Sequence, residues 1–227
     1  YPWTLEPVQK LFADQEFRSF MEEHIENKKS QLLDYCKNKD LTEDTSEEIA
    51  IVDIGWRGTI QDNLCYLFNK AMIHGYYVGL IQFLNKQPDN SRKYGYLDKC
   101  GFARALLTIS TPFEMICNSP NGSTVGYNKN SDGITVAMRN NEKSEDDIFF
   151  TYTNKLQEKV LTDCAALGKY SYDNFIVSED IRCDAYESLK RFIYYPERST
   201  VSSYFNLTHN EEFGVGAYVD KRTVFRP

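Results

Sequence analysis

Residues 50–64 read AIVDIGWRGTIQDNL, and this stretch predicts a buried strand that turns sharply into a helix. Apolar residues surround Asp53, two glycines follow, and a helical pattern opens at Thr59. The first N–H groups of a helix have no partner within it, and the helix dipole is positive at that end. The corner therefore suits an anion such as a phosphate.

A second strand is predicted at Tyr76–Leu84, within the β-branched and aromatic run GYYVGLIQFLNK. It follows a helix predicted at Thr59–Met72, so the chain reads strand, helix, strand over the length of a right-handed crossover. We therefore expect an α/β fold with a Rossmann-like, mainly parallel sheet and flanking helices. In such sheets ligands bind beyond the carboxyl ends of the strands, which is where the loop Asp53–Thr59 falls.

Hydrophobic periodicity divides the chain into three segments that are expected to pack as one compact unit. The predicted segments are an N-terminal helical segment at 1–48, an α/β core with two glycine-containing loops at 49–140, and a mostly helical C-terminal portion at 141–227. The elements expected after the second strand are a polar loop with Tyr94 and Tyr96, a helix at 102–117 that restarts at Pro112, a glycine-rich loop at 119–127, a strand at 134–138, helices at 147–168 and 178–195, and short extended pieces in SSYFNL and FGVGAYV.

Charge and composition narrow the classes of partner. The formal net charge of -7 argues against a protein that mainly neutralises nucleic-acid phosphates. No run approaches the roughly eighteen apolar residues of a membrane span, and the first residues lack the layout of a signal peptide. The six cysteines form no C-x-x-C pair and the three histidines no metal-ligand spacing. We expect a soluble, cytoplasmic protein. No residue is predicted as a metal ligand, and the cofactor is left open, with a divalent metal as one possibility.

Asp53 is the first candidate for chemistry. A carboxylate at the tip of a buried strand must be paired, accept hydrogen bonds from the loop, or hold a cation or a ligand hydroxyl. The alternative is that Asp53 only caps its own turn by accepting N–H bonds from residues 55–58.

The loop itself supplies the predicted ligand-binding residues Gly55, Trp56, Arg57, Gly58, Thr59 and Gln61. Glycines allow positive φ or close approach, and Thr59 is a natural N-cap of the helix. Arg57 could clamp a phosphate or lie free on the surface. Trp56 could stack on a sugar or base, or seal the loop against the core. The spacing fits neither a Walker motif nor the G-x-G-x-x-G fingerprint.

A second polar, glycine-bearing cluster follows an apolar helix in FEMICNSPNGSTVGY. Two such loops in one α/β domain are what a cleft needs, and Glu114 is the second candidate catalytic carboxylate. The alternative is a helix C-terminus that ends in an ordinary Asn-Gly turn. The ligand-binding residues predicted here are Asn118, Ser119, Gly122, Ser123 and Tyr127.

Four stretches together resemble a known bacterial family: LLDYCKNKDL, IVDIGWRGTIQDNL, HGYYVGL and FEMICNSPNGSTVGY. In that family a haloacid-dehalogenase-like hydrolase region precedes a domain with a D-[IV]-G-W-x-G-[ST]-x-Q motif, and the genes commonly lie among those for cell-surface polysaccharides, sometimes fused to glycosyltransferases. The resemblance covers roughly residues 30 to 130. The hydrolase signature D-x-D is absent, because Gly55 stands two residues after Asp53. The resemblance therefore implies that any hydrolase domain lies upstream, as a missing part of the same polypeptide.

Two hypotheses follow from different classes of function. In the first, the chain is a domain of a cell-surface polysaccharide biosynthesis protein that binds a phosphorylated sugar or nucleotide-sugar between the two loops. Glu114, at the start of a helix in TPFE, is similar in position to the acid that retaining glycosyltransferases of the two-Rossmann kind use on the donor sugar. In the second, the chain is a non-catalytic interaction or scaffolding domain, and DIGWRGT is a structural turn.

Overall fold

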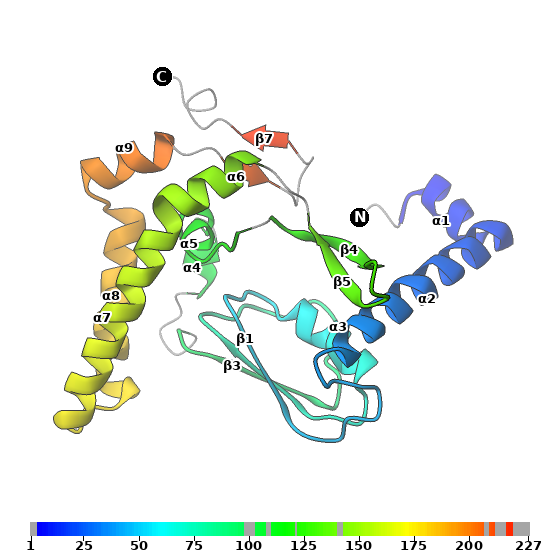
Figure 1. The fold of residues 1–227 in the computed structure, drawn as a ribbon, viewed down its shortest axis with the longest axis horizontal. Coiled ribbons are helices and arrows are strands. Elements are labelled where there is room, and N and C mark those ends of the chain that lie inside the picture. The colour runs from blue at the N-terminus through cyan, green and yellow to red at the C-terminus, as the bar shows by residue number, and fades with distance from the viewer. Residues whose placement is uncertain are drawn as a thin grey trace. The chain divides into compact units, whose positions relative to one another are not determined.

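The computed structural model describes residues 4–97, 103–107, 110–120, 122–139, 143–206, 209–211 and 217–219 (Figure 1). Contacts within the chain group it into two units, which are described separately. One comprises Tyr1–Thr45 and Ser123–Asn140, and the other comprises Ser46–Gly122 and Asn141–Pro227. This grouping places the hairpin region with the N-terminal helices, and the three-segment division from sequence stays a prediction.

The larger unit is built on a three-stranded parallel sheet in the order β1-β2-β3. Its strands are β1 (Ile49–Asp53), β2 (Ile73–Tyr77) and β3 (Ser91–Gly95), and α3 (Thr59–Leu67) connects the first two. The strand–turn–helix–strand reading of this region is confirmed, and with it the mixed α/β class and a parallel sheet.

Helix α3 covers one face of this sheet. Ile73, Gly75 and Tyr77 alternate along β2 as buried residues, because successive side chains of a strand point to opposite faces. Gly75 permits the close approach of the helix: a Cβ at this position would collide with Gln61 Oε1 and lie 2.8 Å from the Tyr77 hydroxyl. The helix and sheet are therefore fitted to a glycine at the centre of the middle strand.

The rest of the larger unit is mostly helical, as expected. A core cluster of Leu97, Leu106 and Ile193 gathers just beyond the ends of β2 and β3, with Val78 and Tyr96 packed against it. The further elements are α4 (Ala103–Leu107), α5 (Thr111–Ile116), α6 (Lys143–Ile148), a π-helix (Phe149–Thr153), α7 (Asn154–Asp173), α8 (Ser178–Tyr194), α9 (Arg198–Asn206), β6 (His209–Glu211) and β7 (Ala217–Val219).

The smaller unit joins two helices to a hairpin. Its elements are α1 (Glu6–Ala13), α2 (Gln15–Lys37), β4 (Thr124–Lys129) and β5 (Thr135–Arg139), the last two antiparallel. The Tyr35 and Tyr127 rings lie 4.9 Å apart, and the Asn38 amide donates to the Thr135 carbonyl oxygen at 3.0 Å. These contacts attach the end of α2 to the hairpin.

Two predictions about the sheet were wrong. The second strand begins at Ile73 and ends at Tyr77, because the following residues leave the ladder to bond the loop after β1: Val78 and Gly79 both donate to the Ile54 carbonyl oxygen. The polar loop expected around Tyr94 is β3, whose inward polar side chains are satisfied by α3 rather than by water.

Two further predictions were wrong outside the sheet. The loop expected at 119–127 contains most of β4, which the glycine and asparagine content of the stretch concealed. The extended piece expected at SSYFNL is helical through Asn206, and Leu207 lies outside the described residues. In FGVGAYV only Ala217–Val219 is described, and these residues form β7. Among the helices of the described residues, none is long and apolar enough to cross a membrane.

Replacing Gly75 by alanine is expected to lower the free energy of unfolding by roughly 1–3 kcal/mol, because the added methyl overpacks the interface between α3 and β2. Urea-induced unfolding followed by circular dichroism measures the effect. Gly168→Ala is the matched control: it lies in α7 with nothing within 4 Å of the added Cβ, and it should gain up to about 1 kcal/mol from helix propensity. Equal effects of the two substitutions would contradict the close packing of α3.

Candidate functional site

The loop after β1 is hydrogen-bonded to the segment that follows β2. Ile54 accepts hydrogen bonds from Val78 and Gly79, and the Trp56 carbonyl oxygen accepts one from Ile81 at 2.8 Å. Gly55 has φ +141°, and a Cβ there would collide with the Gly79 carbonyl oxygen. Only glycine fits this position, so Gly55 serves the close approach of two backbone segments.

The N-cap of α3 is Gly58, which corrects the prediction that Thr59 caps the helix. Gly58 has φ +65°, in the left-handed region that glycine tolerates best, and Thr59 is the first helical residue. A Cβ at Gly58 would lie 2.8 Å from both Lys93 Cε and the Tyr77 hydroxyl. The close approach of Lys93 and Tyr77 therefore requires a glycine at this turn. No side chain caps the helix.

The helix start leaves donors available. Asp62 N–H bonds the Gly58 carbonyl oxygen, whereas the N–H groups of Thr59, Ile60 and Gln61 have no acceptor within the described part of the chain. Thr59 and Ile60 are exposed. Three such amides at the positive end of a nine-residue helix form the local arrangement that binds anions in other proteins.

Arg57 adds positive charge next to these amides. Its guanidinium donates to the Gln82 carbonyl oxygen at 2.6 Å, on the exposed side of the loop. No carboxylate pairs with it among the residues that the structure describes. The guanidinium thus keeps donors for a ligand while one hydrogen bond holds it in place.

Asp53 is half-buried at the end of β1. Its carboxylate lies 3.5 Å from the Gly55 N–H, at the limit of a hydrogen bond, so it caps its own turn only weakly. Its register partner in β2 is Tyr77, whose pKa is raised first by burial and then by the negative charges of Asp53 and Asp62. The Tyr77 hydroxyl is therefore a neutral donor beneath the loop.

Trp56 connects the loop to the second predicted cluster. Its indole Nε1 donates to Glu114 Oε1 at 3.1 Å, and Glu114 lies in the first turn of α5. The ring itself packs against the core cluster of Leu97, Leu106 and Ile193. Trp56 therefore seals the loop against the core, as its alternative reading held, and it also brings the two candidate carboxylate regions together.

Gln61 is fully buried, and both polar atoms of its side chain serve the fold. Its Oε1 accepts from the Tyr77 hydroxyl at 2.7 Å, and its Nε2 lies 2.9 Å from the Ile73 carbonyl oxygen and 2.9 Å from Ser91 Oγ. The side chain joins α3 to β2 and β3, so Gln61 offers a ligand its backbone N–H and not its side chain.

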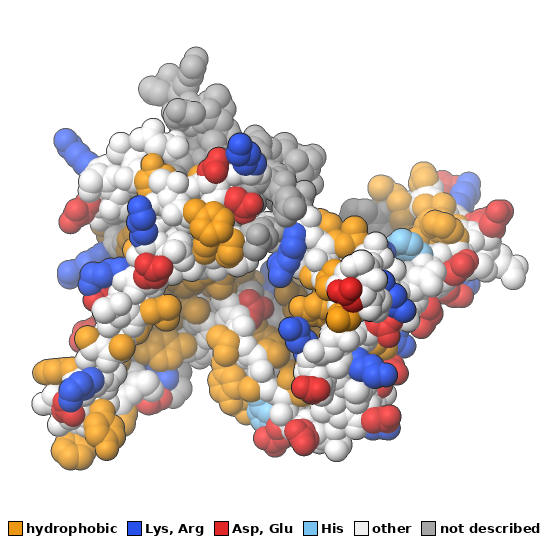
Figure 2. All heavy atoms as spheres, viewed as in Figure 1, with side chains coloured by type: hydrophobic (Ala, Val, Ile, Leu, Met, Phe, Trp, Pro, Cys, Tyr) orange, Lys and Arg blue, Asp and Glu red, His pale blue; other side chains and the backbone are white. Residues whose placement is uncertain are grey.

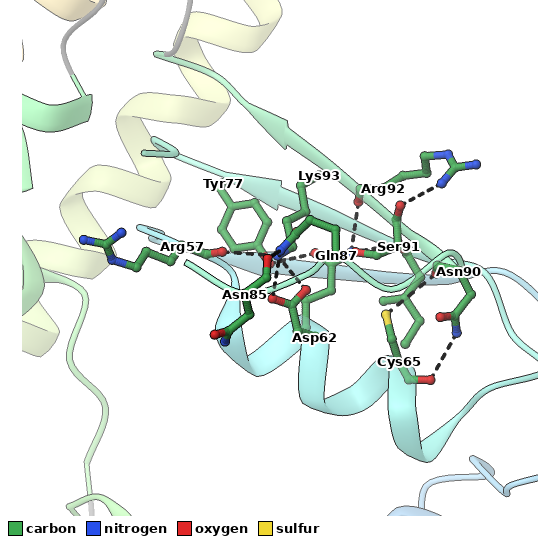
Figure 3. A network of polar contacts seen from close by, with 12 residues as sticks. Arg57, Asp62, Cys65, Tyr77, Asn85, Gln87, Asn90, Ser91, Arg92 and Lys93 are labelled. Atoms are coloured by element: carbon green, nitrogen blue, oxygen red, sulfur yellow. Dashed lines mark hydrogen bonds and ion pairs between the residues drawn. The ribbon is translucent and has the colours of Figure 1, made fainter. Parts of the chain in front are cut away.

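A buried ion pair lies behind the corner, and sequence reasoning missed it. Lys93 Nζ of β3 is 2.6 Å from Asp62 Oδ1 of α3, and the two side chains are only 4% and 6% exposed. Lys93 also donates to the Arg57 carbonyl oxygen at 3.2 Å and to Gln87 Oε1 at 2.8 Å (Figure 3). A lysine at an inward position of β3 was the signal, and it was lost because SRKYG was not recognised as a strand.

The second cluster divides between local turns and the other contact unit. The Asn118 side chain accepts from the Ser119 N–H at 2.9 Å, and the Asn118 carbonyl oxygen accepts from Gln157 of α7 at 2.8 Å. Gly122 closes the larger unit, whereas Ser123 and Tyr127 belong to the smaller one. Asn121 lies outside the described residues.

Tyr127 stands in β4 against Tyr35, and burial raises its pKa. For this cluster the alternative, a helix end followed by an ordinary turn, accounts for the contacts of Asn118 and Ser119. Of the residues predicted there, Glu114 is the one that a hydrogen bond connects to the loop after β1.

Groups of three or more His, Cys, Asp or Glu that could hold a metal ion are absent from the described residues. In comparison with known proteins, no family model and no curated protein matches the chain.

Replacing Lys93 by methionine should lower the free energy of unfolding by about 3–5 kcal/mol, because it leaves the Asp62 carboxylate buried and unpaired. Chemical denaturation measures the loss. Removing both charges with Asp62→Leu and Lys93→Met should restore most of it.

Lys169→Met is the matched control for the lysine. Its Nζ lies at the same 2.6 Å from Asp173 Oδ2, but both side chains are largely exposed, so the loss should stay below about 1 kcal/mol. A Lys93→Met variant no less stable than Lys169→Met would show that the buried pair does not hold α3 on the sheet.

Proposed function

We propose that the chain is a domain of a cell-surface polysaccharide biosynthesis protein, and that it binds a phosphorylated sugar or nucleotide-sugar at the start of α3. The observation that carries the proposal is the set of amides at Thr59, Ile60 and Gln61, which lack acceptors in the described part of the chain, beside Arg57. A phosphate offers what these donors need: negative charge and several acceptor oxygens at one point.

Each residue of the corner has a distinct part in this proposal. Gly58 has no side chain that would block a phosphate from the amides. The Thr59 hydroxyl and the Arg57 guanidinium contact the phosphate oxygens. Asp53 orients a sugar hydroxyl or a divalent cation that accompanies a diphosphate. Glu114, held by the Trp56 indole, binds sugar hydroxyls. Trp56 and Gln61 support the loop from behind.

The sugar part of the proposal rests on the motif D-I-G-W-R-G-T-I-Q and its resemblance to the haloacid-dehalogenase-like family. The phosphate part rests on geometry alone and survives without that resemblance. In the proposal an upstream domain of the same polypeptide supplies any hydrolase or glycosyltransferase chemistry, since Gly55 occupies the place of the second aspartate of the hydrolase signature.

The second candidate function is a non-catalytic interaction domain. It is favoured by the packing of Trp56 and Gln61, which makes much of the motif structural, and by the exposed side chains of Val52, Tyr76 and Tyr94 on the opposite face of the sheet. The two candidates differ in what they predict for small anionic ligands.

Nucleotide-sugars and sugar 1-phosphates, with and without Mg²⁺ or Mn²⁺, should raise the melting temperature of the protein. A ligand at a hundred times its Kd contributes about 2.7 kcal/mol, or roughly 5–10 °C for a chain of this size. Arg57→Ala and Asp53→Asn should each reduce that shift. The effect on the unliganded melting temperature should be small, because Arg57 donates one exposed hydrogen bond and Asp53 accepts one at the 3.5 Å limit. A thermal-shift screen measures both quantities.

Arg18→Ala supplies the control for net charge, because this exposed arginine lies on α2 in the other contact unit. It should leave the ligand-induced shift unchanged. Absence of any shift across the screen would rule out the anion site, and stabilisation by inorganic phosphate alone would support the phosphate subsite without the sugar.

A further inference from the structure

The face of the sheet turned away from α3 carries apolar side chains in solvent. Its two rows are Ala50, His74 and Arg92, then Val52, Tyr76 and Tyr94, as the strand register places them. Val52 is 87% exposed, and Tyr76 and Tyr94 are each about half exposed. Hydrophobic side chains gather over the sheet in the space-filling view (Figure 2).

The aromatic side chains of this face are ordered against one another. The Tyr76 and Tyr94 rings lie 5.3 Å apart in a stacked arrangement, and the His74 and Tyr94 rings lie 6.1 Å apart and nearly parallel. Parallel sheets almost always have both faces covered, because their strands connect through elements that pack on the faces. An ordered aromatic row on an open parallel sheet therefore indicates a docking surface.

We propose that the occupant of this face is a second copy of the chain, packed sheet against sheet around a two-fold axis that runs along the strands. Such an axis keeps the strand direction and exchanges the two edges, so β1 of one copy lies over β3 of the other. Val52 then packs on Tyr94 of the second copy, and the two Tyr76 side chains meet at the centre. An interface of this kind uses the same patch twice, as two-fold dimers do.

Charge on the face is complementary under that symmetry. Glu48 precedes β1 on this side, with its carboxylate exposed and 3.8 Å from His74 Nε2. Arg92 of β3 donates only to the backbone carbonyl oxygens of Asp89 and Ser91, and no carboxylate pairs with it in the described ranges. Exchange of the two edges brings Glu48 of one copy to Arg92 of the other, twice per dimer.

The size of the face sets the strength of the association. Three five-residue strands span roughly 14 by 17 Å, well below the ~800 Å² per partner of a standard interface. The dimer should therefore be weak, with a Kd on the order of tens to hundreds of micromolar.

Sedimentation equilibrium of the full chain from about 1 to 500 µM should show a monomer–dimer equilibrium in that range. Val52→Lys should weaken the dimer by at least roughly tenfold, because it buries a charge at the interface, while the fold of the monomer is unchanged for a residue so exposed. Val160→Lys makes the same change on α7, away from the face, and should leave the equilibrium unchanged.

A charge swap tests the two-fold arrangement itself. Glu48→Arg and Arg92→Glu should each weaken the dimer by like-charge contact, and the double variant should recover an affinity near that of the original chain. A chain that stays monomeric throughout the range, a dimer indifferent to Val52→Lys, or a double variant without recovery each overturns the proposal. In the first case the face is left to a different partner, whereas the anion site at the start of α3 is unaffected because it does not involve these residues.

Discussion

The larger unit depends on one ion pair, between Lys93 of β3 and Asp62 of α3. Lys93 reaches the helix from the third strand and also bonds the Arg57 carbonyl oxygen, so a single ammonium group connects β3, α3 and the loop between β1 and α3. The free-energy cost of removing two charges from water can exceed the attraction between them. We interpret the pair as fixing the position of α3. The helix packs on the sheet where Asp62 pairs with Lys93 and Gln61 bonds Tyr77.

The same pair constrains what the corner can do chemically. Because Asp62 neutralises Lys93, the lysine offers no net charge to a ligand, and attraction for an anion comes from the amides of α3 and from Arg57. Asn90 caps the C-terminal end of α3. Its side-chain amide lies within hydrogen-bond distance of the carbonyl oxygens of Cys65, Phe68 and Ala71. With both ends fixed, the helix presents its free N–H groups in a constant direction, which is the condition for a preorganised anion site.

Sequence reasoning predicted the elements whose signals are local. The run AIVD and the turn GWRGT define β1 and the start of α3 within a few residues, and the glycines mark close backbone approach correctly. It failed where a residue's environment comes from far along the chain. SRKYG has the composition of a loop, and it becomes a strand because Gln61 and Asp62, some thirty residues earlier, satisfy Ser91 and Lys93. The structural role of the Gln61 side chain was missed for the same reason, because its partners in β2 and β3 cannot be read from its neighbours in sequence.

The two faces of the sheet differ in burial: one is covered by α3 and the other is exposed. The two proposals concern different surfaces for this reason. On the face toward α3, polar side chains are buried in pairs, Asp62 with Lys93 and Gln61 with Tyr77. Lys93 also donates to the Arg57 carbonyl oxygen, which helps to hold the loop after β1 in place. On the opposite face, Val52, Tyr76 and Tyr94 are exposed, and no described element of the larger unit covers them. An anion at the start of α3 acts through backbone amides at the carboxyl edge of β1, whereas a docked partner acts through side chains of the open face. Because the middle strand contributes Gly75 and Tyr77 to one face and His74 and Tyr76 to the other, a substitution on the open face leaves the contacts beneath the loop in place, so the two proposals can be tested independently.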